Sequence, residues 1–263
     1  MATSLTHMDD FSEVSGAALV VGGSGGIGRA VVRLLAQRGS DVALTWRSGQ
    51  VAADRLVDEI GSYGVRLSTH QLDATDIDAC AGVIAEVLKR HGGLHTLVHA
   101  AGPHVPMTHL SNVEPAAMTD QLGVDVGAFF NVVRPALPAL RESRGSIVAV
   151  TTAATSRYPA RDGLSSTPKA AVEALVRALA VEEGRYGVRA NSVGPGMLTD
   201  GIAQRLIESG ELDDRALEVI RGNIPLHRFG IAHDIAEAVC FLASHPAGFL
   251  SGQKLDVDGG YGT

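Results

Sequence analysis

Two short stretches of the 263-residue chain carry the residues with the clearest potential for chemistry. In VGGSGGIGRA (21–30), five glycines and a serine follow an apolar run and open a helical pattern. Glycine lets the backbone approach a pyrophosphate, and a helix N-terminus offers free N–H groups and a positive dipole end. In DGLSSTPKAAVEAL (162–175), Lys169 comes one helical turn after Ser165. The first stretch predicts a dinucleotide site, with a merely flexible loop as the alternative.

The end of the second predicted strand bears on which dinucleotide would bind. An acid usually stands there to hold the ribose 2′-hydroxyl of NAD, but this chain has Trp46, followed by Arg47 and Ser48. An arginine and a hydroxyl suit a 2′-phosphate, so we expect NADP(H), unless Arg47 is an ordinary solvated arginine. Asp73 can accept from the adenine amino group, or it can cap the next helix in competition with Asp76.

These residues need elements that bring them to one edge. Short apolar runs, typical of buried parallel strands, alternate with longer helical patterns. We predict strands at 17–21, 41–46, 65–71, 94–100, 146–152, 188–193 and 253–257, and helices that begin near 27, 52, 77, 115 and 168. This alternation implies right-handed βαβ crossovers and one doubly wound α/β sheet. Residues 1–14 are predicted to be a loose tail, and 197–231 a short helical flap over the site.

Composition excludes several other classes of protein. The net charge is −7 and no block of lysine or arginine occurs, which argues against nucleic acid or an anionic membrane as the main partner. The N-terminus does not resemble a signal peptide, and no apolar stretch approaches 18 residues. Cys80 and Cys240 are isolated, as in a reducing compartment, and the histidines show no metal-ligand spacing. We therefore expect a soluble cytoplasmic protein without a metal site.

Several motifs in fixed order resemble those of the classical short-chain dehydrogenases/reductases, most closely the 3-oxoacyl-acyl-carrier-protein reductases. The resemblance runs from about Ala17 to Gly260. It rests on VGGSGGIG (21–28), LDATD (72–76), HAAG (99–102), PKAAVEAL (168–175), VRANSVGPG (188–196), RFGIAHDIAEAVCFLAS (228–244) and SGQKLDVDGG (251–260).

The resemblance implies a single NAD(P)-binding Rossmann-type domain over 15–263, with a seven-stranded parallel sheet in three α/β/α layers. It implies a small-molecule substrate and a homotetramer or homodimer in which the last strand and two long helices form interfaces. The residues that it assigns to cofactor binding are Gly22, Ser24, Gly25, Gly26, Ile27, Gly28, Trp46, Arg47, Ser48, Asp73, Ala74, Ala100, Ala101, Gly102, Lys169, Pro195, Gly196 and Thr199.

The usual catalytic set of this family is an asparagine, a serine, a tyrosine and a lysine. By the resemblance these positions fall on Asp125, Thr152, Ser165 and Lys169, so only the lysine is kept. The family's NNAG turn is here HAAG, which begins at His99. The site that the resemblance implies is therefore degenerate.

The tyrosine of the family donates a proton to the carbonyl oxygen, and the neighbouring lysine lowers its pKa and holds the nicotinamide ribose. Ser165 is far less acidic and too short to replace it. It also belongs to a serine–threonine cluster before Pro168 that reads as a helix N-cap. Thr152 keeps a hydroxyl that can polarise a carbonyl. Asp125 would need a partner such as Lys169, or would be partly protonated.

Other side chains are candidates for the missing proton donor. His99 and His104 flank the end of the fourth predicted strand, and Tyr158 lies in the loop before Ser165. Histidine is the side chain best matched to proton transfer near neutral pH. His99 is the foremost alternative, although that position more often supports backbone geometry.

Three functions fit these observations. The first is an NADP(H)-dependent oxidoreductase that reduces a carbonyl or oxidises the matching alcohol, on an acyl thioester or a similar substrate, with an atypical proton route. The second is a non-catalytic subunit in a mixed oligomer with a complete member of the family. The third is an NADP-binding module, or an isomerase or dehydratase on the same scaffold, because a fold does not fix a function.

Overall fold

Seven short strands with apolar residues on both faces form the centre of the molecule. The structure is a computed structural model that describes residues 11–199 and 214–263. Every residue of the first, fourth and fifth strands is buried, as parallel strands covered on both sides must be. The strands are β1 Ala17–Val21, β2 Asp41–Trp46, β3 Leu67–Gln71, β4 Leu94–His99, β5 Ser146–Val150, β6 Arg189–Pro195 and β7 Lys254–Val257. Their ends lie within two residues of the predicted ones.

All pairings between these strands are parallel, in the order β3-β2-β1-β4-β5-β6-β7. The predicted seven-stranded, doubly wound sheet is thus confirmed. The order reverses between β1 and β4, and ligands of such sheets bind at this switch point, beyond the carboxyl ends of the strands.

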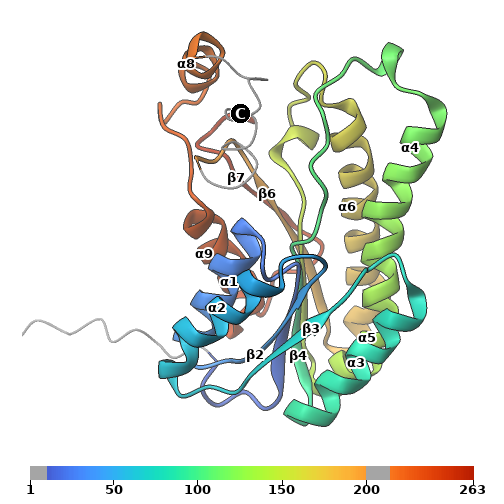
Figure 1. Ribbon diagram of the computed structural model, residues 1–263, viewed down its shortest axis with the longest axis vertical. Helices are drawn as coiled ribbons and strands as arrows, with labels where there is room; N and C mark the ends of the chain where they lie inside the picture. Colours follow the sequence, from blue (N-terminus) through green and yellow to red (C-terminus); the bar gives the residue numbers. More distant parts are fainter. Residues whose placement is uncertain (1–10, 200–213) are drawn as a thin grey trace, which may run out of the picture.

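Helices cover both faces of the sheet, which gives the three α/β/α layers. Figure 1 shows α1, α2 and α9 on one side and α3, α5 and α6 on the other. Each side has its own apolar cluster between helices and sheet. The helices are α1 Gly26–Gln37, α2 Gln50–Ile60, α3 Ile77–His91, α4 Pro115–Leu122, α5 Ala128–Ser143, α6 Gly163–Glu183, α8 Asp214–Gly222 and α9 Ala232–Ala243. Cys80 and Cys240 are buried in these two separate clusters and form no disulfide bond.

The helix predicted near residue 115 continues through an irregular turn. Residues Gly123–Gly127 form a π-helical segment between α4 and α5, and Asp125 lies in its middle. Such segments widen a helix by one residue and are frequent at functional sites. The irregularity moves Asp125 out of the ordinary helical register.

The prediction that a helix begins near residue 168 was wrong. α6 begins at Gly163 with Asp162 at the N-cap, so Ser165 lies inside the first turn rather than at the cap. The backbone carbonyl of Asp162 accepts from the N–H groups of Ser165 at 3.0 Å and Ser166 at 2.8 Å, which starts the helix early. Pro168 is tolerated near the helix start because it removes only one backbone hydrogen bond.

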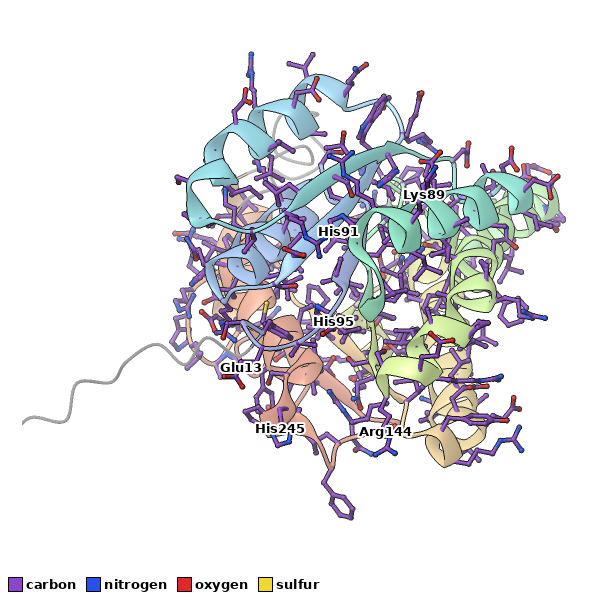
Figure 2. All side chains as sticks on the ribbon, turned by 90° about the horizontal axis from the view of Figure 1, so that it is seen from below. Glu13, Lys89, His91, His95, Arg144 and His245 are labelled. Carbon is purple, nitrogen blue, oxygen red and sulfur yellow. The ribbon has the colours of Figure 1, made fainter. Side chains whose placement is uncertain are left out.

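The predicted tail also needs correction. Residues 1–10 lie outside the described residues, but Phe11 is 3% exposed and stacks on His95 at 5.7 Å. The backbone N–H of Phe11 donates to Arg38 O at 3.1 Å. The segment is held here because burying a large aromatic ring stabilises the fold. His91 and His95 lie at this amino end of the sheet, which Figure 2 shows from below. Of the predicted flap, residues 200–213 lie outside the described residues.

Candidate functional site

The glycine-rich turn after β1 has the backbone geometry of a phosphate cradle. Gly22 has φ +78°, and a Cβ there would lie 2.8 Å from the Cα of Ala101. A Cβ on Gly28 would collide with the carbonyl oxygen of Gly22, so α1 packs against the turn only because both are glycines. The Gly22 N–H donates to the buried Thr45 Oγ1 at 3.1 Å, which joins the turn to β2.

The N-terminus of α1 leaves its donors available for a ligand. Its N-cap is Gly25, and no side chain caps the helix or places an acid in its first turn. The predicted residues Ser24, Gly26 and Ile27 belong to this same turn. The Ser24 hydroxyl lies against Gly49, since a Cβ on Gly49 would be only 3.0 Å from Ser24 Oγ. Uncapped N–H groups at a helix start fit an anionic pyrophosphate.

The residues predicted at the adenosine end follow β2 and β3. Trp46 is partly buried, and its Nε1 is buried without a hydrogen-bond partner in the described structure. Arg47 and Ser48 are exposed beside it. The Asp73 carboxylate accepts from Thr75 N at 3.0 Å and Oγ1 at 2.7 Å, and these bonds lower its pKa, so the group stays ionised and can accept further.

The competition between Asp73 and Asp76 as helix cap is settled. Asp76 is the N-cap of α3 and accepts from Ala79 N at 2.9 Å. Asp73 is therefore free of that role. Asn131, which the sequence reading missed, donates from α5 to the carbonyl oxygen of Ala74 at 3.1 Å and holds this loop in place.

The residues predicted at the nicotinamide end follow β4 and β6. Ala100 donates to Val21 O at 2.9 Å, which fixes the turn of Ala101 and Gly102 beside the glycine-rich turn. A Cβ on Gly102 would lie 3.2 Å from Lys169 Nζ, so the missing side chain leaves the ammonium accessible. Pro195 ends β6, and Gly196 and Thr199 follow it: the N–H of Gly196 donates to Val257 O at 3.0 Å and that of Thr199 to Gly230 O at 2.9 Å.

Lys169 and Asp125 form a buried ion pair at the centre of the site. The distance from Lys169 Nζ to Asp125 Oδ1 is 2.6 Å, and the Asp125 side chain is 1% exposed. Gln121 Nε2 donates to Asp125 Oδ2 at 2.7 Å. The expectation that Asp125 needs Lys169 as a partner is confirmed by this geometry. Gln121 was missed, although its spacing of four residues from Asp125 is the spacing that brings helical neighbours together.

The two hydroxyl residues of the degenerate set lie on different elements. Thr152 caps a short 3₁₀ turn after β5, where its Oγ1 accepts from Ala154 N at 3.1 Å, and it is partly exposed. Ser165 is partly exposed in the first turn of α6. Tyr158 is 60% exposed, and His104 is exposed. Thr152 follows the carboxyl end of β5, and Ser165 and Lys169 lie in the first two turns of α6, the helix that comes next in the doubly wound order.

The surroundings of His99 argue against a role as proton donor. It is 3% exposed, with its ring edge-on to Phe129 at 5.5 Å, and its Nε2 is buried without a partner in the described structure. Burial, together with the Lys169 ammonium, lowers the pKa of His99 to about 3. The ring is therefore neutral near pH 7 and packs as a core side chain.

The fold and the ordered motifs define a family of oxidoreductases. The sequence model of the family described as "Enoyl-(Acyl carrier protein) reductase" matches residues 21–262. The chain belongs to the classical short-chain dehydrogenases/reductases, and it is similar to 3-oxoacyl-acyl-carrier-protein reductases.

Individual relatives match nearly the whole chain. A versicolorin reductase of Emericella nidulans is 32% identical over 97% of this chain and 99% of its own length. A 3-oxoacyl-[acyl-carrier-protein] reductase of Staphylococcus aureus is 33% identical over 92% of this chain and 96% of its own.

Solved structures agree with this placement. A short-chain dehydrogenase/reductase from Mycobacterium ulcerans is 28% identical with a TM-score of 0.88, covering 95% of this chain and 91% of its own. A short chain dehydrogenase from Burkholderia cenocepacia, solved in complex with NADP, is 29% identical with a TM-score of 0.86, covering 96% of this chain and 100% of its own. Within residues 11–199 and 214–263, no helix combines the length and apolar character needed to cross a membrane.

Proposed function

We propose that this protein is an NADP(H)-dependent oxidoreductase that reduces a carbonyl, or oxidises the matching alcohol, on an acyl thioester or a similar substrate. The observation that carries the proposal is the glycine-rich turn before α1, whose N-terminal N–H groups no side chain caps. Lys169 adds to it, because its Nζ would lie 3.2 Å from a Cβ on Gly102 and so stands next to the turn of Ala101 and Gly102. NADP(H), when bound, supplies the hydride, and the protein positions and polarises the reactants.

The side chains of the chain divide the remaining work. Lys169 holds the nicotinamide ribose, Asp125 positions Lys169, and Gln121 donates to Asp125. Thr152 donates its hydroxyl proton in a hydrogen bond to the substrate carbonyl, because its Oγ1 uses only acceptor capacity on Ala154 N. Arg47 and Ser48 bind the 2′-phosphate, which selects NADP(H) over NAD(H).

Titration of the cofactor site tests this proposal directly. Trp46 is the sole tryptophan, so its emission reports binding at the adenosine end. We expect strong quenching by NADPH and weak quenching by NADH. NADPH consumption is then followed with acetoacetyl thioesters and aromatic ketones. A folded protein that binds neither nucleotide, by emission and by calorimetry, would contradict the proposal.

A second candidate is a non-catalytic subunit that pairs with a complete relative. Three of the four catalytic positions have changed, while apolar residues remain exposed on the helices and the loop that the family uses for assembly. These residues are Phe130 on α5, Val181 on α6, Phe241 on α9 and Phe249 before β7. This candidate predicts NADPH binding without turnover and co-purification of a second short-chain subunit.

Assembly and compartment follow from the same proposal. We expect a homotetramer or homodimer in the cytoplasm, with Phe249, which is fully exposed, covered by a partner subunit. Light scattering after size exclusion measures the mass, and Phe249→Ser should shift it toward the monomer. The exposed Val51→Ser, on α2, is the matched control and should leave the mass unchanged.

A further inference from the structure

Among the helices whose N-caps the structure describes, those of α3 and α6 are aspartates, and these two differ in how they meet the helix. Asp76 accepts from Ala79 N at 2.9 Å at the start of α3. Asp162 stands at the same position of α6, yet its side chain makes no cap hydrogen bond. An N-cap aspartate normally satisfies a free N–H of the first turn. The carboxyl of Asp162 is therefore not used to start the helix.

The helical repeat places Asp162 on the face that carries the site. Residues three and seven positions apart lie on one side of an α-helix, so Asp162, Ser165 and Lys169 follow one another along that side. All three are partly exposed, whereas Leu164 and Ser166 are buried. Ser165, which lies between Asp162 and Lys169 in the chain, carries only a small side chain.

A loop from the carboxyl end of β4 encloses the Asp162 turn. Thr108 N donates to Arg161 O at 2.9 Å, and the Arg161 guanidinium donates to Met107 O at 3.0 Å. A Cβ on Gly163 would lie 2.7 Å from Leu110, so the loop packs directly on the start of α6. The enclosure withdraws the Asp162 carboxyl from water, and this burial raises its pKa to about 6.

Burial by itself accounts for the raised pKa of Asp162. The cations of this segment and of the start of α6 have partners elsewhere: Arg157 donates to Tyr261 O, Arg161 to Met107 O and Lys169 to Asp125. The charged and titratable groups on the segments that meet here are His104, His109, Glu114, Asp120, Arg157, Tyr158, Arg161 and Lys169.

We propose that the carboxylic acid of Asp162 supplies the proton to the substrate oxygen in place of a side chain at residue 165. The inference rests on the proposed function. The carbonyl carbon gains a hydride with its two electrons, the C=O π bond opens, and the oxygen takes the Asp162 proton. The Asp162 carboxylate then regains a proton from water. In the oxidative direction the same carboxylate accepts the proton of the alcohol.

Asp162→Asn tests the role in catalysis, with Asp58→Asn on the exposed face of α2 as the matched control. General acids contribute about 10²–10⁴-fold, so kcat should fall at least about 100-fold while quenching of Trp46 by NADPH is unchanged. The wild-type kcat for reduction should fall as the pH rises through 6, and the residual activity of Asp162→Asn should lack that limb. Asp162→Glu should retain part of the activity and the limb.

A second measurement does not depend on turnover. Carboxyl ¹³C NMR of aspartate-labelled protein, with Asp162→Asn to assign the resonance, should show one carboxyl that titrates near pH 6. Titration of Asp162 in the ordinary range near pH 4 would overturn the inference.

The outcomes separate this inference from the proposed function. Wild-type protein that binds NADPH but turns over no carbonyl substrate overturns both. Turnover that Asp162→Asn retains at the wild-type rate overturns the role of Asp162 alone. Circular dichroism of each variant shows that the fold is kept.

Discussion

The two halves of the sheet's carboxyl edge carry different kinds of information. On the β1–β3 half, the site consists mainly of backbone: glycines at Gly22 and Gly28 that no other residue can replace without a collision. On the β4–β6 half, the proposed site consists of side chains, and the resemblance to the family predicts that three of the four usual ones are changed. A cradle built from backbone geometry depends on the fold, whereas side chains can change while the fold stays the same.

The comparison also shows how the changed half stays stable. The aspartate at residue 125 places a carboxylate in a buried position, where Lys169 pairs with one of its oxygens and Gln121 donates to the other. In the proposed function the same lysine holds the nicotinamide ribose, so one ion pair would serve both the packing of this half and cofactor binding. The predictions below test that division of roles.

The largest effect is expected at this ion pair. Lys169→Met leaves the Asp125 carboxylate buried with Gln121 as its remaining partner, and breaking such a pair costs about 3–5 kcal/mol in the free energy of unfolding. Adding Asp125→Asn removes the uncompensated charge and should recover most of the loss. Urea unfolding measures both. A Lys169→Met protein within about 1 kcal/mol of wild type would contradict a structural role for the pair.

The next effect should be confined to the nucleotide half. Arg47→Ala removes a charge-assisted hydrogen bond worth about 1.5–3 kcal/mol, so the Kd for NADPH should rise at least about tenfold while that for NADH changes little. Arg55→Ala, on the exposed face of α2, is the matched control. Calorimetry measures the two constants. An equal loss for both nucleotides would show that Arg47 does not read the 2′-phosphate.

A third prediction restores the changed half. Ser165→Tyr places a phenol beside Lys169, which lowers its pKa and makes it an acid for the substrate oxygen. In the Asp162→Asn protein, which lacks the proposed acid, Ser165→Tyr should raise carbonyl reduction about tenfold or more, because a positioned acid contributes at least that much. NADPH consumption under saturating substrate measures the gain. A folded variant that binds NADPH without any gain would mean that Asp125 and Thr152 also limit the reaction.

The smallest effect concerns two buried histidines at opposite ends of β4. His95 bonds Ser40 Oγ at 3.2 Å and Thr96 Oγ1 at 3.0 Å at the amino end, and burial lowers its pKa to about 4. His99 at the carboxyl end has a pKa lowered to about 3. Both stay neutral in the folded protein while the unfolded chain takes up protons below about pH 6.5.

The sign follows from that difference. The unfolded state binds more protons as the pH falls from 6.5 toward 4, so the free energy of unfolding should fall by about 1 kcal/mol per pH unit for each histidine. The raised pKa of Asp162 acts in the opposite direction over part of this range. Urea unfolding at several pH values measures the slope, and His95→Gln should reduce it. His109→Asn, on an exposed loop, should leave the slope unchanged.

The sequence by itself determined the elements and the nucleotide half. Runs of apolar residues set the strands, and glycine spacing set the turn after β1, because both are local properties of the chain. The order of motifs placed Lys169 in the helix that follows the fifth strand, where the structure has it. The buried Phe11 and the start of α6 at Gly163 were missed, since both depend on contacts with segments distant in sequence or on a backbone carbonyl.

Only the tertiary structure decided how the changed residues combine. The sequence left Asp125 with a choice between pairing and protonation, and the π-helical turn brings it to 2.6 Å from Lys169 Nζ. It left His99 as a candidate acid, and burial against Phe129 makes that ring neutral. Charge, burial and partner are set by residues far apart in the chain, so local patterns cannot fix them.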